Sequence, residues 1–206
     1  MSNEPTAKRI WELFAELLDY PRVSPVEMLE ECRTLTGAMS REAEASLADF
    51  QTFAQTVNIG RLQEEYTRAF DMDESHSLYV GYHLLGESYK RSALLLEFME
   101  RYKAYDMEVA GELSDYLPVV LRFLTICDDQ NLTDEIVGEA MWPMLEMMVK
   151  QGEEPEDAHA DEEPRPPTVP VPYHGLLAAL LFVVRVSPMS DPQPLVSTVD
   201  IGWPTT

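Results

Sequence analysis

The sequence predicts an all-α fold, a single-domain helical bundle with a disordered acidic and proline-rich segment near its C-terminus. Apolar residues repeat at three- and four-residue steps through most of residues 1–150, and no segment sustains the alternation of a half-buried strand. Apolar residues make up 45% of the 206 positions, which suffices for one sizeable core. No repeat with a period of about 20 to 50 residues is found, so a solenoid is not expected.

The first helices can be justified in order along the chain. Residues 7–19 place apolar side chains on one stripe, and Pro21 prevents that helix from continuing. A second helix is predicted over residues 25–35, with Ser24 as its N-cap ahead of a proline at the first helical position. A third begins near Ser40, a favourable N-cap residue followed by acidic residues in the first turn.

The helical period resumes after Gly60 and continues through the second half of the chain. We expect one long helix over residues 79–103 and another that begins near Pro118. A further helix starts at about Thr133, which can cap it.

The chain is divided into a helical domain at 1–150, a flexible linker at 151–173, and an apolar segment with a loose tail at 174–206. Residues 153–172 hold seven acidic residues and six prolines, so they bury too little apolar surface to offset the entropy of ordering. The apolar run at 176–184 is interpreted either as a last core helix that folds back on the bundle or as a strand-like or partner-docking segment.

The net charge of −22, from 37 acidic and 15 basic residues, disfavours binding to nucleic acid or to anionic lipid surfaces. A cationic partner fits better, although an acidic surface also serves solubility. The first residues lack the apolar stretch of an export signal, and the longest apolar run is far shorter than the roughly 20 residues that span a bilayer. We therefore expect a cytoplasmic protein without stable membrane insertion.

Metal binding is not indicated by the cysteines and histidines. His83 and Glu87 are four residues apart, so on a helix they share one face and can offer two ligands, but no third ligand stands at a recognisable spacing. Cys32 and Cys127 are far apart and form no C-x-x-C pair. The sequence predicts neither a metal site nor a bound cofactor.

Catalytic motifs are likewise not found. Ser88, His83 and Asp115 supply the residue types of a hydrolase triad, but no nucleophile elbow or glycine-rich oxyanion loop accompanies them. There is no P-loop and no G-x-G-x-x-G sequence. We expect no enzymatic activity and assign no catalytic residue.

The same part of the chain offers the groups of a peptide-binding groove. Aromatic rings can bury the apolar face of an amphipathic peptide, and carboxylates can pair with its Arg or Lys side chains. The alternative is that the aromatic residues belong to the core. The aromatic candidates are Tyr66, Phe70, Tyr82 and Tyr116, and the acidic ones are Glu65, Asp71, Glu87 and Asp115.

Four ordered motifs resemble the NarJ branch of the NarJ/TorD/DmsD assembly chaperones. They are LLDYP at 17–21, LQEEYTRAFD at 62–71, YHLLGESYKR at 82–91 and GELSDYLPVVLRFL at 111–124. The third is close to the family pattern H-x-H-G-E-S, with Leu85 in place of its second histidine. The resemblance spans roughly residues 10–125.

This resemblance implies a TorD-like helical bundle that binds the catalytic (alpha) subunit of a molybdoenzyme, often at its N-terminal peptide. The chaperone keeps this apo-subunit competent for insertion of the molybdenum cofactor, with cofactor-delivery proteins as further partners. Nitrate reductase is the expected client; the alternatives are another enzyme of the dimethyl sulfoxide reductase superfamily, acting on selenate, chlorate or an organic substrate, or a helical scaffold or regulator without such a client. The residues expected to bind the client are Tyr66, Phe70, His83, Gly86, Glu87, Ser88, Asp115, Tyr116 and Leu117.

Overall fold

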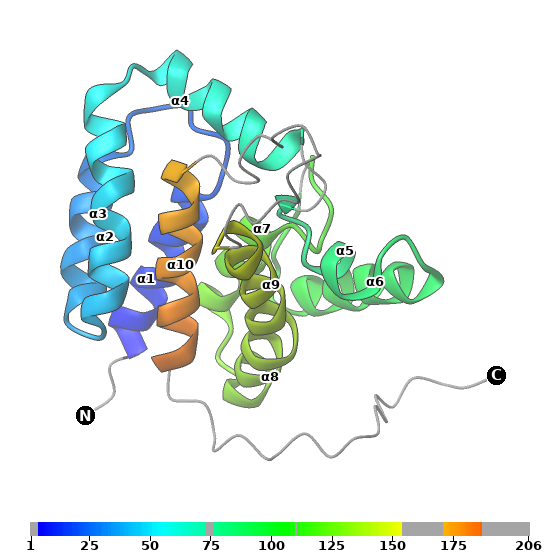
Figure 1. The fold of residues 1–206 in the computed structure, drawn as a ribbon. Coiled ribbons are helices and arrows are strands. Elements are labelled where there is room, and N and C mark those ends of the chain that lie inside the picture. Colours follow the sequence, from blue (N-terminus) through cyan, green and yellow to red (C-terminus); the bar gives the residue numbers. More distant parts are fainter. Residues whose placement is uncertain (1–3, 73–75, 110, 154–170, 187–206) are drawn as a thin grey trace.

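The chain folds into the all-helical body that the sequence predicts (Figure 1). The computed structural model describes residues 4–72, 76–109, 111–153 and 171–186, and in these ranges the only β-type pairing is an isolated antiparallel bridge between Tyr79 and Tyr116. None of the described helices is both long and apolar enough to cross a membrane.

Ten α-helices and two π-helical segments make up the described part of the chain. In order, they are α1 (Glu4–Leu17), α2 (Val26–Gly37), α3 (Arg41–Thr56), α4 (Ile59–Tyr66), the π-helix η1 (Thr67–Asp71), α5 (Val80–Leu85), α6 (Tyr89–Ala104), α7 (Leu117–Ile126), α8 (Gln130–Glu135), the π-helix η3 (Ile136–Met141), α9 (Trp142–Glu153) and α10 (Val171–Val186).

Local capping explains where several helices begin. The Ser40 hydroxyl accepts a hydrogen bond from the Ala43 backbone amide at the start of α3, as predicted. The prediction that Ser24 caps the second helix is wrong. Helix α2 starts at Val26, one residue later than predicted, and its N-cap position is Pro25, which offers no side-chain cap. A proline with no polar side chain leaves the first backbone amides of α2 without a side-chain acceptor.

The long helix predicted over 79–103 is wrong, because the chain breaks between α5 and α6. Gly86 has φ +59° and ψ −161°, a conformation that is open to glycine and strained for other residues. Ser88 then caps α6 by accepting a hydrogen bond from the Arg91 amide. His83 and Glu87 therefore do not share one helix face. In the same way, α8 begins after Asp129, whose carboxylate caps it, and not at Thr133.

Helix α10 is part of the core. It packs against α3 and α9, and Figure 1 shows it between them. Apart from the half-buried Phe182, the apolar residues of the run 176–184 are almost completely buried, which confirms the core-helix interpretation. They include Leu176, Leu177, Leu180, Val183 and Val184. Residues 171–186 therefore belong to the helical body. The rest of the predicted linker and tail, at 154–170 and 187–206, lies outside the described residues.

Close approach of two backbones explains Gly175 near the start of α10. A Cβ atom at this position would lie 2.3 Å from the carbonyl oxygen of Ser46 in α3, a separation that no side chain tolerates. Glycine therefore sets the spacing between α3 and α10.

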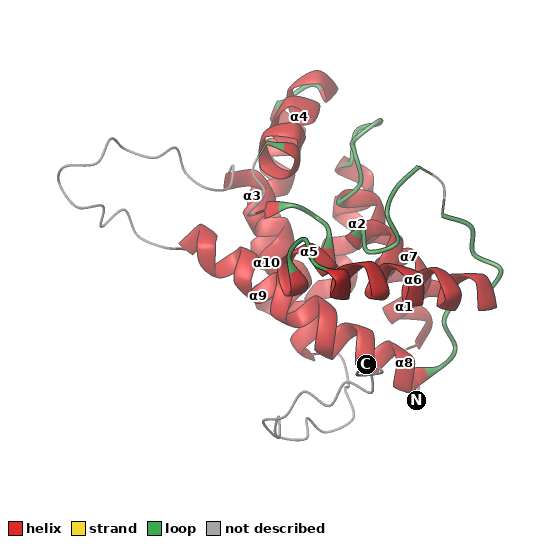
Figure 2. Cartoon of the chain, turned by 90° about the vertical axis from the view of Figure 1, so that its right-hand side faces the viewer, coloured by secondary structure: helices red, strands yellow, loops and turns green. Residues whose placement is uncertain are grey.

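Helices α5 and α6 extend from the side of the bundle in Figure 1 and face the viewer in Figure 2. Helix α6 is anchored through its inner face, where Phe98 and Tyr102 are buried and the Tyr102 hydroxyl donates to the Ser114 carbonyl at 2.7 Å. This places residues 82–91 beside the segment at 111–117.

Candidate functional site

Backbone hydrogen bonds join two of the sequence motifs. The Val80 amide donates to the Asp115 carbonyl at 2.9 Å, and the Leu117 amide donates to the Leu78 carbonyl at 2.8 Å. These bonds flank the bridge between Tyr79 and Tyr116. The start of α5 is thereby fixed to the start of α7.

A buried ion pair lies beneath this junction. Arg91 donates from Nε to Oδ2 of Asp115 at 3.0 Å, and the two side chains are 14% and 0% exposed. The guanidinium carbon lies 5.7 Å from the centre of the Tyr79 ring and 5.6 Å from that of Tyr82, within the range of cation–π attraction. A Cβ atom on Gly81 would lie 2.8 Å from Oδ2 of Asp115, so glycine makes room for the pair.

This arrangement assigns Asp115 an internal partner. Arg91 already compensates its charge, and a direct ion pair between Asp115 and a peptide would require the pair to open. The role of Asp115 in client binding therefore stays a prediction. Arg91 could not be recognised as a site residue from the sequence, because its partner is 24 positions away and no local pattern links the two residues.

Three of the predicted groove aromatics lie in the core. Tyr66, Phe70 and Tyr116 are 3%, 6% and 7% exposed. The rings of Tyr66 and Phe70 are 5.0 Å apart, and both pack against Tyr173 of α10. The hydroxyls of Tyr66 and Tyr116 are 2.7 Å apart. Leu117 is completely buried as well, so these residues shape the site from beneath.

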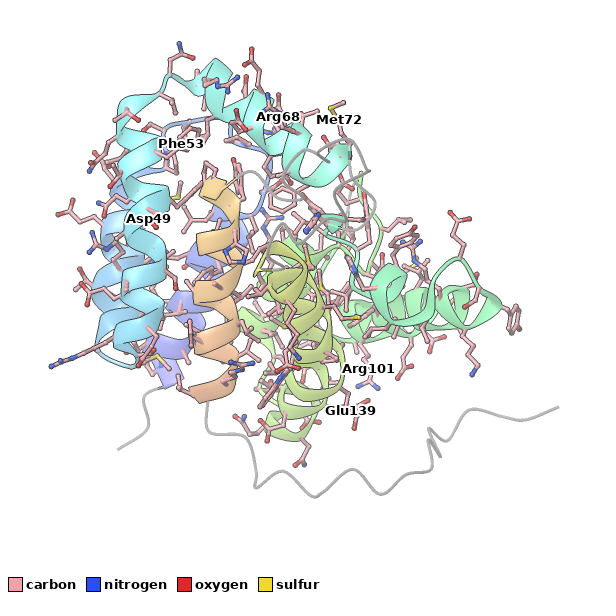
Figure 3. All side chains as sticks on the ribbon, in the orientation of Figure 1. Asp49, Phe53, Arg68, Met72, Arg101 and Glu139 are labelled. Atoms are coloured by element: carbon pink, nitrogen blue, oxygen red, sulfur yellow. The ribbon has the colours of Figure 1, made fainter. Side chains whose placement is uncertain are left out.

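Four exposed groups and the half-buried Tyr79 form what we call the acidic–aromatic surface, which lies above this cluster and is made of Tyr20, Asp71, Met72, Tyr79 and Glu112. Tyr20 meets the Tyr66 ring edge to face at 5.5 Å. Tyr79 packs on Tyr116 at 5.4 Å and donates its hydroxyl to Glu112 at 2.9 Å. Met72 is 77% exposed and projects from the end of η1 (Figure 3). Apolar and anionic groups are thus combined on one surface.

The ionisation of this surface follows from burial and neighbouring charge. Partial burial and, less strongly, the charge of Glu112 raise the pKa of Asp71, against a hydrogen bond from the Thr67 side chain. Burial and then the hydrogen bond to Glu112 raise the pKa of Tyr79 to about 12. Tyr79 therefore stays protonated at neutral pH and can donate to Glu112. A cation placed between Asp71 and Glu112 would relieve their mutual repulsion.

The remaining predicted site residues surround the break between α5 and α6. Gly86 ends α5, Ser88 caps α6, and Glu87 between them is exposed. Nε2 of His83 lies 2.6 Å from the carbonyl oxygen of Ser77. The structure gives Gly86 and Ser88 local backbone roles, and it leaves Glu87 open to a partner.

Burial of His83 predicts a pH effect. Desolvation lowers the pKa of His83, although its hydrogen bond to Ser77 opposes this. As the pH falls below about 6.5, this histidine takes up a proton in the unfolded chain before it does so in the folded chain. The free energy of unfolding therefore decreases with falling pH until the pKa of His83 in the folded chain is passed. An NMR titration measures this pKa, and the imidazole resonance of His83 is assigned by its absence from the spectrum of His83→Gln. We expect that resonance to titrate with a pKa below 6.5, and a pKa above 6.5 would contradict the desolvated environment.

Metal ligands do not gather in the described ranges, where no group of three His, Cys, Asp or Glu side chains could hold an ion. Cys32 and Cys127 are both free and buried, and burial raises the pKa of the Cys32 thiol to about 12. A thiol of this kind is a core group and not a reactive one.

Residues 36–162, more than half of the chain, match the family described as the nitrate reductase delta subunit. The chain belongs to the nitrate reductase delta subunit family. Its match to Escherichia coli K12 NarW, described as a probable nitrate reductase molybdenum cofactor assembly chaperone, is 26% identical over 151 residues and covers 71% of this chain and 63% of NarW. The chain therefore spans less than two thirds of that relative.

A second similar protein and a solved structure extend the comparison. E. coli NarJ, a nitrate reductase molybdenum cofactor assembly chaperone, is 26% identical over 117 residues, which cover 54% of this chain and 49% of NarJ. A crystal structure described as a redox enzyme maturation protein from Archaeoglobus fulgidus superposes with a TM-score of 0.51 at 18% identity, covering 86% of this chain and 91% of that one. That likeness supports the all-helical fold.

Proposed function

We propose that this protein is an assembly chaperone without enzymatic activity. It binds the apo catalytic subunit of a nitrate reductase-like molybdoenzyme at the N-terminal peptide and keeps it competent for cofactor insertion. Membership of the nitrate reductase delta subunit family and the similarity to NarW and NarJ carry this proposal, because those two proteins are described as nitrate reductase molybdenum cofactor assembly chaperones, NarW as a probable one. A chaperone that binds the apo-subunit preferentially increases the population of that apo form. The chaperone is released when cofactor binding stabilises the closed form of the subunit.

The acidic–aromatic surface suits this role. A peptide with apolar and cationic side chains can bury the former on Tyr20, Met72 and Tyr79 and pair the latter with Asp71 and Glu112. Glu87, also exposed, can add to the same attraction. The net charge of −22 favours encounter with a cationic peptide and opposes binding to nucleic acid.

We expect the tagged full chain to recover a molybdenum oxidoreductase catalytic subunit from cells grown under anaerobic respiratory conditions. Mass spectrometry identifies the subunit, and metal analysis of the complex should find it without molybdenum, because the chaperone prefers the apo form. The identity of the recovered subunit decides between nitrate reductase and another molybdoenzyme.

The contribution of the acidic–aromatic surface is tested with two charge-matched baits. Asp71→Asn with Glu112→Gln removes two charges from the surface, whereas Glu27→Gln with Glu30→Gln removes two exposed charges from α2. Recovery should fall for the first double variant and persist for the second. Equal recovery by both would place the client elsewhere, and no oxidoreductase recovered by the wild type would refute the proposed function.

A further inference from the structure

A cavity of about 320 Å³ lies where the loop between α1 and α2 meets α3, α4 and α10. This volume is at the small end of ligand pockets and accommodates one large side chain. The inner wall is formed by apolar and aromatic groups from five helices: Leu17, Met28, Phe50, Leu62 and Tyr173. Such a wall favours an apolar occupant.

The motif LLDYP at 17–21, to which no role has been assigned, ends α1 and begins the loop that forms one side of this pocket. Two long-range hydrogen bonds fix it. The Gln63 amide donates to the Pro21 carbonyl at 2.9 Å, and the Tyr66 hydroxyl donates to the Leu18 carbonyl at 3.1 Å. Val23, which also lines the pocket, is 66% exposed. The pocket is therefore largely preformed and reachable from solvent.

Charges at the pocket edge balance. Glu16, Asp19 and Arg22 line the pocket. Arg122 pairs with Asp19, and its Nη2 lies 3.5 Å from Oε1 of Glu16. Two carboxylates and two guanidinium groups thus lie at or beside the pocket edge, so their charges balance and leave no net charge to attract an ion. The balanced charges at the edge and the apolar inner wall together favour an uncharged side chain that is largely apolar.

Aromatic contacts connect the pocket to the carboxylates of the acidic–aromatic surface. Tyr20 lines the pocket and meets Tyr66 at 5.5 Å between ring centres. The Tyr66 hydroxyl meets that of Tyr116, the Tyr116 ring meets Tyr79, and Tyr79 donates to Glu112. A charge-balanced pocket with an apolar inner wall and an anionic surface therefore lie at the two ends of one packed aromatic path.

From this layout we infer that the pocket is the anchor site for one large apolar side chain, such as Trp, Phe, Leu or Met, of a cationic peptide. The anchor fills the pocket beside Tyr20 and Val23, while Lys or Arg residues of the same peptide lie over Asp71 and Glu112. A few side chains buried in pockets commonly supply most of the affinity of an interface. This inference rests on the proposed function, because it specifies how the client peptide is held.

The test uses a synthetic peptide that carries one tryptophan among lysines and small polar residues, titrated calorimetrically into the full chain. Val23→Trp fills the pocket mouth and should weaken binding about tenfold or more. Leu96→Trp is the matched control, since Leu96 is 62% exposed on α6 and does not line the pocket; its affinity should stay within about twofold of the wild type.

A second peptide, in which alanine replaces the tryptophan, completes a thermodynamic cycle. It should bind the wild type about tenfold more weakly than the parent peptide does. Its affinity for Val23→Trp should be little lower than its affinity for the wild type. In the wild type, the methyl NMR signal of Met28, assigned with Met28→Leu, should shift with the parent peptide only. Three results would overturn the inference. The parent peptide does not bind the wild type, the affinity difference between the tryptophan and alanine peptides is the same in the wild type and in Val23→Trp, or Leu96→Trp weakens binding.

These results separate the inference from the proposed function. If Val23→Trp recovers the oxidoreductase subunit from cells as well as the wild type does, the anchor site is wrong and the chaperone role stands. If the wild type recovers no such subunit while the synthetic peptide still requires the pocket, the chaperone role is wrong and the peptide site stands.

Discussion

Replacing Asp115 by asparagine is expected to lower the free energy of unfolding by about 3 to 5 kcal/mol, the usual cost of breaking a buried ion pair from one side. Asp115 is completely buried, and its Oδ1 accepts no hydrogen bond from any described residue. Its stabilisation therefore comes through Oδ2 and Arg91. An amide in its place leaves the Arg91 charge in a mostly buried position without an anion. Urea denaturation followed by circular dichroism measures the change.

Asp19→Asn is the control for this prediction. Asp19 also pairs with an arginine, Arg122, but their side chains are 34% and 36% exposed, so its loss should cost no more than about 1 kcal/mol. Replacing Arg91 and Asp115 together by apolar residues should cost less than the sum of the single changes. An Asp115→Asn protein as stable as the wild type would show that the pair does not hold α6 to the bundle.

Gly175→Ala should destabilise the protein by about 3 kcal/mol or more, at the upper end of the range for overpacked cores. The added Cβ would meet the Ser46 carbonyl oxygen at 2.3 Å. Backbone atoms cannot rotate away as a side chain can, so α10 must shift relative to α3 and disturb the buried residues of both helices. Thermal denaturation of the purified variant measures the loss.

Gly60→Ala provides a matched helical control. Gly60 is exposed in α4, and its added Cβ would lie 3.3 Å from the Asn58 side chain, which can adjust. This change should alter stability by no more than about 1 kcal/mol, and alanine's higher helix propensity favours a gain. Equal effects of the two substitutions would mean that α3 and α10 do not approach as closely as described.

The helical fold was predictable because each helix has one buried face, and its spacing is visible in the sequence. The breaks between helices were harder to predict from the sequence. Gly86 and Ser88 together signal a helix end followed by an N-cap, yet the apolar period on either side hides them. The π-helical segments η1 and η3 were missed, since the extra residue in a π turn leaves no local composition signal.

That two of the sequence motifs meet in the fold was predictable, but the contacts between them were not. The motifs at 82–91 and 111–124 do come together. The burial of Tyr66 and Phe70, however, depends on Tyr173 of α10, a helix whose packing partner cannot be read from its largely apolar sequence. The pairing of Arg91 with Asp115 and that of Tyr79 with Glu112 arise from tertiary contacts. Periodicity identifies apolar positions, but it does not tell a groove from a core.

The position of α10 also affects how the chain folds during synthesis. Tyr173 completes an aromatic cluster with Phe50, Tyr66 and Phe70, and its hydroxyl reaches the Leu62 carbonyl 111 residues earlier in the chain. At the usual elongation rate, a ribosome needs about 5 to 20 s to add that many residues. Throughout this interval the nascent protein exposes apolar rings that its own last described helix has yet to cover, so this protein has a vulnerable stage of its own.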